Sequence, residues 1–186
     1  EILGCERSAA LAALASFRGV ERRLSVRWRD GLERGVLVED YAHHPTELRA
    51  AIAALRESWP EHTLTVVFQP HRYERIRHYG QEFAAVLSGA DRVVVAAPFA
   101  AWLNDVQLAD PRGLAEAVKG PPCCYWDAGF PELANKLLRE LPERPWAVAV
   151  VGAGDVQDLV HRLAAGLKDA RLEKLRQRLH EVGVQA

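Results

Sequence analysis

Short apolar runs alternate with amphipathic helical segments along most of this chain, and this alternation constrains the fold more than any other feature. The runs are rich in valine and other apolar residues, which is typical of buried parallel strands. The predicted parallel strands are residues 64–68, 92–96, 123–126 and 146–151. The predicted helices are residues 6–17, 45–58, 72–88, 111–118, 131–140 and 155–165. This order predicts an α/β protein with a mostly parallel sheet covered on both faces, a Rossmann-like three-layer α/β/α domain.

The first strands of the chain follow a different pattern. Residues 24–29 alternate apolar and polar side chains, as a half-buried strand does, and Asp30-Gly31 is a turn signal. A second strand starts at residues 36–38, so the pair predicts an N-terminal antiparallel strand or hairpin on a sheet of about six strands. Ligands of such sheets bind outside the carboxyl ends of the strands. Three polar segments follow predicted strands and are therefore candidates for a site: 40–47, 69–77 and 152–155.

The composition excludes several classes of function. Lys and Arg total 24 and Asp and Glu total 25, so the bulk charge favours neither nucleic acid nor an anionic membrane as a partner. No apolar run reaches the roughly 18 residues that a membrane-spanning helix needs. No signal-peptide pattern occurs either, and we expect a cytoplasmic protein. The three cysteines, including the adjacent Cys123 and Cys124, have neither zinc-site nor disulfide-framework spacing, so we expect ordinary thiols and no metal site.

Two features of the sequence concern the ends of the chain. The chain contains no Met and starts at Glu1, which indicates a piece of a longer polypeptide. Residues 169–186 place four apolar side chains on one stripe among charges: Leu172, Leu175, Leu179 and Val182. This stripe predicts an amphipathic helix packed on its own domain or, alternatively, a dimer contact.

The segment Asp40-Tyr-Ala-His-His-Pro-Thr-Glu47 lies between a predicted strand and a predicted helix. Pro45 suits the first helical position and Glu47 complements the helix dipole, so both have a structural explanation. The candidate binding residues of the segment are Asp40, Tyr41, His43 and His44. A carboxylate at a helix start can accept both hydroxyls of a ribose, and an imidazole can contact a carboxylate or a phosphate.

Two arginines follow the next predicted strand, in Gln69-Pro-His-Arg-Tyr-Glu-Arg75. Arg72 and Arg75 are three residues apart and would share a face in the first helical turn. Positive charge there opposes the helix dipole, and a local rule broken without compensation often marks function. Two guanidiniums beside free backbone N–H groups would clamp a carboxylate or phosphate. The alternative is a pair of solvated arginines bound to nearby glutamates. We expect Arg77 and His78 to be surface residues.

Two further segments have weaker signals. Gly152-Ala-Gly-Asp155 lacks the third glycine of a dinucleotide fingerprint, so a tight turn capped by Asp155 is the simpler interpretation. Arg22-Arg23 is either a solvated pair or places an arginine at a hinge between domains, where it could reach a nucleotide. The chain contains no Gly-x-x-x-x-Gly-Lys-Ser/Thr loop, no Gly-x-Ser-x-Gly elbow and no His-Glu-x-x-His motif.

Four segments, in this order and at this spacing, resemble the Mur ligase family, and within it the branch that adds L-alanine. They are Phe17-Arg-Gly-Val-Glu-Arg-Arg23, residues 40–47, Phe68-Gln-Pro-His-Arg-Tyr73 and residues 152–155. The resemblance covers nearly the whole chain. It implies the end of a central ATP-binding domain and a linker over 1–22, the family's C-terminal domain over 23–168 and a C-terminal helix over 169–186.

The resemblance also implies a reaction. In this family of peptidoglycan-synthesis ligases, one domain holds the UDP-sugar, a second holds ATP and Mg²⁺ on a P-loop, and the last presents the amino acid. ATP phosphorylates the muramate carboxylate, and the amine of the amino acid attacks the acyl phosphate. The implied partners are L-alanine, ATP, UDP-N-acetylmuramate and the other domains of the same polypeptide. Because the P-loop and the magnesium ligands are absent here, the chain alone would be inactive.

Residue by residue, the resemblance implies that Asp40 binds the ATP ribose and Arg23 contacts the nucleotide. The implied substrate-binding residues are Tyr41, His43, His44, Arg72 and Arg75, of which His43, Arg72 and Arg75 would be catalytic. The chain departs from the family at Ala97–Asp105, where a Pro-Ala-Gly-Glu stretch is usual. Two alternatives stay open: a stand-alone nucleotide- or anion-binding module, and a sibling ligase that recycles murein tripeptide, against which Gln69-Pro-His-Arg72 argues.

Overall fold

In the computed structural model, which describes residues 4–17, 19–31, 34–99 and 109–181, the described strands form one sheet in the order β1-β2-β6-β3-β4-β5. The strands are β1 (Ser25–Arg29), β2 (Gly35–Asp40), β3 (Thr63–Phe68), β4 (Arg92–Ala96), β5 (Cys123–Trp126) and β6 (Trp146–Val151). β1 pairs antiparallel with β2, and the other neighbours pair in parallel. The predicted mostly parallel sheet with an N-terminal hairpin is therefore confirmed.

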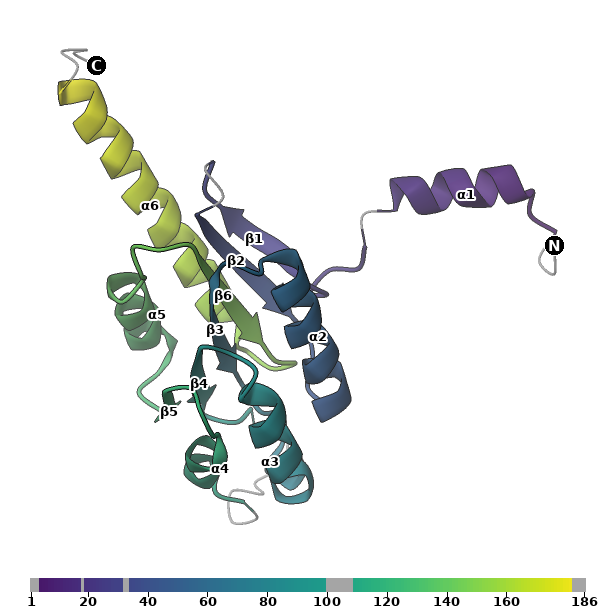
Figure 1. Cartoon of the computed structure of the whole chain (residues 1–186), viewed down its shortest axis with the longest axis vertical. Helices are drawn as coiled ribbons and strands as arrows, with labels where there is room; N and C mark the ends of the chain where they lie inside the picture. Colours follow the sequence, from purple (N-terminus) through teal and green to yellow (C-terminus); the bar gives the residue numbers. More distant parts are fainter. Residues whose placement is uncertain (1–3, 18, 32–33, 100–108, 182–186) are drawn as a thin grey trace.

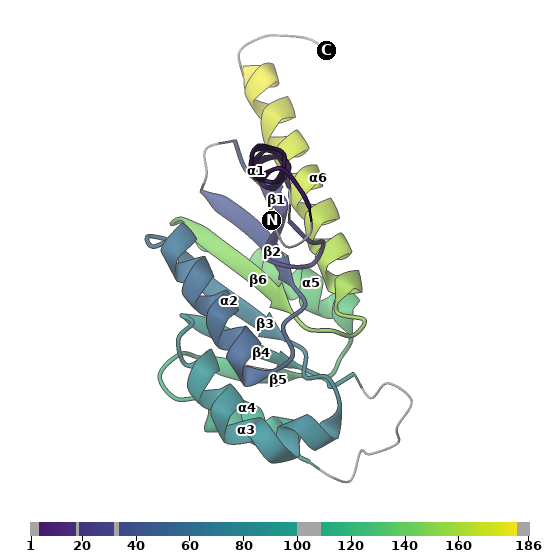
Figure 2. The same cartoon turned by 90° about the vertical axis from the view of Figure 1, so that its right-hand side faces the viewer.

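Helices cover both faces of the sheet, as Figures 1 and 2 show. The helices are α1 (Arg7–Ser16), α2 (Pro45–Ser58), α3 (Tyr73–Leu87), α4 (Pro111–Ala117), α5 (Phe130–Arg139) and α6 (Gln157–Glu181). α2, α3 and α4 pack on one face over the alternate strand residues that include Val66 and Val95. α5 and α6 pack on the other face, against Val67 and Val94.

The sequence pattern explains these elements. All six residues of β6, Trp-Ala-Val-Ala-Val-Val, are buried, because a central strand with a helix on each face has no polar side. α2 begins with Pro45 at its first turn, as predicted, and buries the apolar positions Leu48, Ala51, Ile52 and Leu55 that predicted it.

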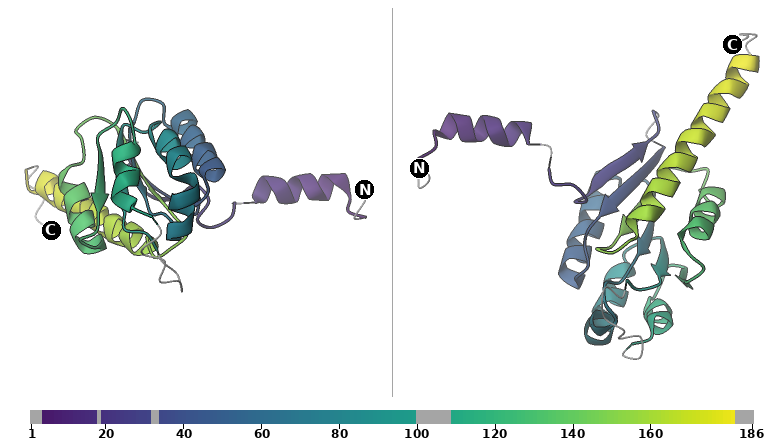
Figure 3. Two further views of the ribbon diagram at one scale, coloured as in Figure 1. Left: turned by 90° about the horizontal axis from the view of Figure 1, so that it is seen from below. Right: turned by 180° about the vertical axis from the view of Figure 1, so that it is seen from behind.

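The two terminal helices differ from the rest. α1 buries none of its residues and projects away from the sheet (Figures 1 and 3), and Leu14 is 68% exposed. α6 is one continuous helix, so the expected boundary at residue 168 falls inside it. Leu172 of the predicted apolar stripe is 53% exposed, and the other three side chains of the stripe lie outside the described part of the chain.

Among the helices that the structure describes, none combines the length and the apolar character needed to cross a bilayer.

Candidate functional site

The three polar segments meet at the carboxyl edge of the sheet. In the pairing register, Val151 at the end of β6 lies opposite Asp40 of β2 on one side and Phe68 of β3 on the other. The loops after these three adjacent strands are therefore neighbours. α2 and α3 leave the edge toward one face and α6 leaves toward the other. A strand flanked by neighbours whose helices lie on the opposite face is where open α/β sheets bind ligands.

Asp40 is held by the backbone of its surroundings. The side chain is 5% exposed, and its two oxygens accept hydrogen bonds from Leu24 N at 2.8 Å and Ala42 N at 2.7 Å. The carboxylate thereby joins the chain before β1 to the loop after β2. Its remaining lone pairs are what a ribose hydroxyl could use.

Arg22 and Arg23 have different surroundings. Arg22 lies over the Tyr41 ring, with its guanidinium carbon 4.7 Å from the ring centroid, and forms an ion pair with the buried Glu39 at 2.7 Å. The Arg23 side chain is 48% exposed, lies 5.8 Å from the same ring and comes within 3.9 Å of Glu47. Of the two, only Arg23 is therefore available to reach a ligand from solvent.

The histidines after β2 divide into one that caps a helix and one that faces the edge. His44 is the N-cap of α2, where its Nδ1 accepts a hydrogen bond from Thr46 N, and its ring packs edge-on against Tyr79. His43 contacts the Tyr41 carbonyl oxygen through Nδ1 at 3.0 Å. Its backbone N–H donates to Glu47 at 3.0 Å. His44 thus has a structural task that the sequence interpretation did not include.

Glu47 stays ionised in this position. Burial alone would raise the pKa of its carboxyl, but the hydrogen bond from His43 N and the charges of His43 and Arg23 outweigh burial and lower the pKa. The Nδ1 atom of His43 lies 3.6 Å from this carboxylate.

The expectation that Arg72 shares a helix face with Arg75 is wrong. α3 begins at Tyr73, and Arg72 precedes it with φ +70°, outside the helical region. The cause is a contact distant in sequence: the Arg72 N–H donates to the carbonyl oxygen of Phe99 at 3.0 Å, so it is not a free helix N–H either. A non-glycine residue at positive φ costs about 1 kcal/mol or more and persists where its surroundings enforce it, often at functional sites.

Both arginines nevertheless lie close enough to His71 for their charges to lower its pKa. Among the described residues, no ion pair includes Arg72 or Arg75. One terminal nitrogen of Arg75, Nη1, is buried without a hydrogen-bond partner. A buried guanidinium N–H without an acceptor is costly unless an anion completes it. The alternative of solvated arginines paired with glutamates holds in part: Arg72 is exposed, but neither arginine is paired with a described glutamate.

His71 is the site residue that the sequence interpretation missed. Its ring lies 5.9 Å from that of His43 and is stacked on that of Phe99 at 5.7 Å. Burial and then the positive charges of Arg75, Arg72 and His43 lower the pKa of His71 below its ordinary value of 6.5. Four cationic or potentially cationic groups therefore meet here, and we call His43, His71, Arg72 and Arg75 the basic cluster. No periodic pattern marks His71, because it precedes the helix.

We expect a bound anion to raise the pKa of His71. In the free protein the neutral ring is favoured, so the stability associated with it is present above pH 6.5 and is lost as the pH falls below that value. Sulfate in the basic cluster would favour the protonated ring and shift its titration upward. Histidine NMR signals, recorded against pH with and without sulfate, test this. The exposed His161 on α6 is the control, and an equal shift of both rings would contradict a local site.

The glycine turn after β6 allows close packing at the site, but its glycines have no side chain that could bind a ligand. A Cβ on Gly152 would lie 2.9 Å from the Gln69 carbonyl oxygen, and one on Gly154 would lie 2.5 Å from Phe99 Cβ. The expected capping by Asp155 needs a correction. Its carboxylate accepts a hydrogen bond from the side-chain nitrogen Nε2 of Gln69 at 2.7 Å, while the side-chain oxygen Oε1 of Gln69 accepts one from Val156 N at 3.1 Å. The buried Gln69 side chain thus does the capping and joins the turn to β3.

Replacing Gly154 with alanine is expected to destabilise the fold by roughly 1–2 kcal/mol, because the new methyl overpacks against Phe99 and Gln69. Gly80→Ala is the matched control, since a Cβ at this helical position meets nothing within 4 Å. It should stabilise α3 by up to about 1 kcal/mol. Urea unfolding of both variants measures the difference, and a neutral Gly154→Ala would mean that the turn is looser than the contacts indicate.

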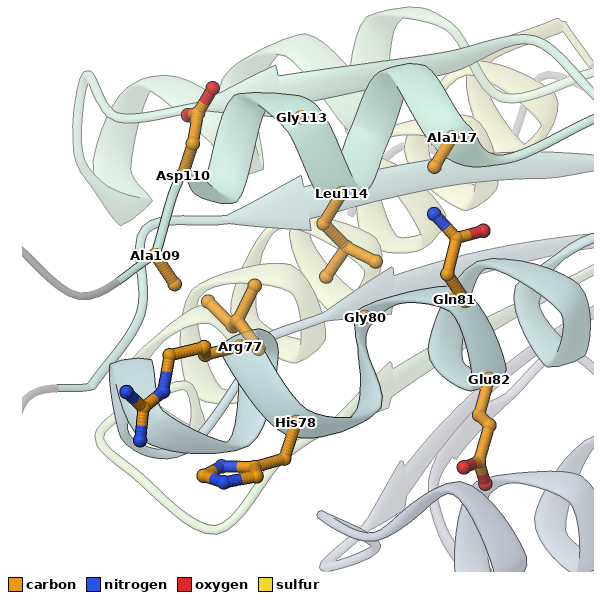
Figure 4. Close-up of a pocket in the computed structure, with 11 residues that line it drawn as sticks. Arg77, His78, Gly80, Gln81, Glu82, Ala109, Asp110, Gly113, Leu114 and Ala117 are labelled. Atoms are coloured by element: carbon orange, nitrogen blue, oxygen red, sulfur yellow. The ribbon is translucent and has the colours of Figure 1, made fainter.

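A cavity of about 360 Å³ lies between α3 and α4, and Figure 4 shows its lining. None of the predicted site residues lines it, whereas the surface residue Arg77 does. The carboxylate of Asp110 beside it already accepts Arg112 N as the N-cap of α4. The site is therefore assigned to the sheet edge rather than to this cavity.

The remaining expectations concern metals, cysteines and the segment after β4. Within the described residues, no group of three His, Cys, Asp or Glu side chains could hold a metal ion. Burial, and next the neighbouring Cys124, raises the pKa of the Cys123 thiol to about 11, so it is not a nucleophile at neutral pH. Of the segment Ala97–Asp105, which departs from the family pattern, residues from 100 onward lie outside the described residues.

Known proteins match this chain over most of its length. A family model described as Mur ligase, glutamate ligase domain, matches residues 22–154. A UDP-N-acetylmuramate–L-alanine ligase of Halorhodospira halophila is 41% identical over 172 residues, which are 89% of this chain and 35% of that relative. The chain spans about a third of the length of the curated relatives it matches.

Solved structures also match this chain over most of its length. The UDP-N-acetylmuramate–alanine ligase MurC of Thermotoga maritima is 27% identical with a TM-score of 0.74, over 91% of this chain and 35% of that one. The murein peptide ligase of Psychrobacter arcticus is 17% identical with a TM-score of 0.64, over 89% and 34%, which shows a shared fold only.

Proposed function

This chain belongs to the Mur ligase family, and we propose that it is the C-terminal part of an ATP-dependent ligase that joins L-alanine to UDP-N-acetylmuramate. The observation that carries the proposal is the basic cluster beside the carboxyl edge, in a chain 41% identical to a ligase of that name. In the proposed enzyme, the terminal phosphoryl group of ATP passes to the muramate carboxylate and leaves ADP, and the amine of L-alanine then displaces phosphate from this acyl phosphate to form the amide.

The basic cluster would hold the amino acid and stabilise developing charge. Arg75 has a buried N–H without an acceptor, and Arg72 has no carboxylate partner among the described residues. A guanidinium is suited to a carboxylate or phosphate, because its planar donors match two oxygens. His43 and His71 add two imidazole rings beside the arginines. Preorganised positive groups of this kind stabilise a transition state in which oxygen atoms gain negative charge.

The other end of the edge would meet the nucleotide. Arg23 is exposed and lies against the Tyr41 ring, from which it could reach a phosphate or the base. Asp40 would accept a ribose hydroxyl while keeping its two backbone hydrogen bonds. His44 caps α2 and packs on Tyr79, so its ring already has two structural contacts.

Only part of an ATP site fits the described residues. ATP would supply the phosphoryl group that activates the carboxylate, and Asp40 and Arg23 fit its nucleoside end. No described carboxylate cluster fits Mg²⁺, and the sequence contains no P-loop for the triphosphate. We therefore assign the triphosphate and the metal to other domains of the same polypeptide, and we expect the coding sequence before Glu1 to contain a P-loop.

The two alternatives have less support. The sibling that recycles murein tripeptide is represented by a structure only 17% identical, whereas relatives named for L-alanine addition are 33–41% identical. In a stand-alone anion-binding module we would expect the apolar side chains of α1 and of the residue after it to be buried or replaced, but Leu11, Leu14 and Phe17 are all exposed.

The test is a ligase assay on the full-length protein with UDP-N-acetylmuramate, ATP and Mg²⁺, measuring ADP and product formation. We expect product with L-alanine, none with murein tripeptide, and none from the 186-residue chain alone. Turnover with tripeptide but not with L-alanine would favour the sibling ligase. Tight ATP binding by the isolated chain, with no activity in the full-length protein, would favour the stand-alone module.

A further inference from the structure

A buried carboxylate on β2 binds two arginines from different parts of the chain. Glu39 is 1% exposed. One of its oxygens accepts Arg22 Nε at 2.7 Å, and the other accepts Arg27 Nε at 2.6 Å. Arg27 belongs to β1, the hairpin partner of β2, whereas Arg22 belongs to the linker between α1 and β1. A single guanidinium is enough to neutralise a carboxylate, so the second arginine needs another explanation.

The other contacts of Arg22 all lie at the site. Its Nη2 donates to the Gly152 carbonyl oxygen at 3.0 Å, and its guanidinium lies over the Tyr41 ring. Its own carbonyl oxygen accepts the Tyr41 N–H at 2.7 Å. Arg22 therefore contacts the ends of both β2 and β6 and the first residue of the loop that carries His43. Arg27 has none of these contacts with the loops.

The backbone around Arg22 supports the same role. Arg22 and Leu24 have φ of +58° and +44°, a conformation that non-glycine residues adopt only where neighbouring contacts enforce it. Leu24 is held by Asp40, and Arg22 by Glu39. On the other side of Arg22, Val20 is 62% exposed and Gly19 has open space around it. The fixed part of the linker thus begins at Arg22.

We propose that Arg22, held by Glu39, is a positioning residue that locks the linker onto the carboxyl edge and sets the place of the Tyr41 ring. A locked linker gives the preceding domain a defined starting point from which to meet the site. It also holds Tyr41 beside Arg23 and His43 before substrates bind. The expected effect of Arg22 on catalysis rests on the proposed ligase function. Its expected effect on the position of the linker does not.

Arg22→Ala and Arg27→Ala form a matched pair for the test, because each removes one guanidinium from the same carboxylate. Hydrogen–deuterium exchange of the whole chain measures the exchange rates of the two amides that we expect this lock to protect, Leu24 N–H and Tyr41 N–H. We expect both to exchange at least about tenfold faster in Arg22→Ala and to change little in Arg27→Ala. Arg22→Gln, which loses less packing, is measured alongside and should behave like Arg22→Ala.

Steady-state kinetics of the full-length protein give the second readout. A misplacement of about 1 Å can cost up to 10²-fold in rate, so we expect kcat/KM to fall about tenfold in Arg22→Ala and less than twofold in Arg27→Ala. Faster exchange in both variants, or in neither, would overturn the lock, as would equal kinetic losses. If exchange separates the variants but the wild-type protein has no ligase activity, the lock stands and the proposed function fails.

Discussion

Replacing Arg75 with alanine in the full-length protein is expected to lower kcat/KM for L-alanine by about 10²-fold or more. The buried Nη1 of this side chain has no partner, and its charge acts on His71 at the same place. An anion that completes this N–H would be bound more tightly as its negative charge grows, so the loss should fall on kcat as well as on KM. Because no described ion pair involves Arg75, its removal should cost the fold little.

Arg77→Ala is the control for this experiment. Arg77 lies two residues along the same helix, is exposed and lines the cavity between α3 and α4. The same loss of one positive charge there should leave kcat/KM within about twofold, because a surface charge acts weakly through solvent. Equal losses in both variants would indicate a general charge effect. Unchanged kinetics in Arg75→Ala would remove it from the site.

The pattern of apolar residues predicted most of the architecture, because each element obeys one local rule. The spacing of Leu48, Ala51, Ile52 and Leu55 describes the buried face of α2, and Pro45 marks its start. Valine runs describe β3, β4 and β6, and their alternation with helices places the polar segments at one edge of a parallel sheet. The convergence of the loops after β2, β3 and β6 was therefore predictable without knowing any contact.

The details that failed depend on contacts between residues distant in sequence. Arg72 leaves the helix because its N–H pairs with Phe99, which no local rule could indicate. The cap expected from Asp155 comes instead from Gln69, which is 86 positions away from it. Glu39 is a charged residue at the end of a buried strand, and its two arginines become visible only when the hairpin and linker are folded. The location of these arginines and histidines at the edge was hence predictable as a set, whereas their individual contacts were not.

Asp40→Asn is expected to destabilise the fold by about 2–3 kcal/mol and to raise the KM for ATP. Both carboxylate oxygens accept a backbone N–H in a side chain that is 5% exposed. Asparagine has one carbonyl oxygen and one NH₂ group, so either Leu24 N–H or Ala42 N–H would face another donor. The loss of that hydrogen bond loosens the linker, and the loss of an acceptor weakens a ribose contact.

Asp30→Asn separates these two consequences. The Asp30 carboxylate also accepts a backbone N–H, that of Arg34 at 2.7 Å, but it does so in the exposed hairpin turn. That variant should lose less than about 1 kcal/mol and keep the KM for ATP, because water can satisfy the released donor. Urea unfolding and ATP kinetics of the full-length protein, recorded well below the melting temperature, measure both quantities. A destabilised Asp40→Asn with an unaltered KM for ATP would leave Asp40 as the residue that ties linker to loop and would assign the ribose to another part of the polypeptide.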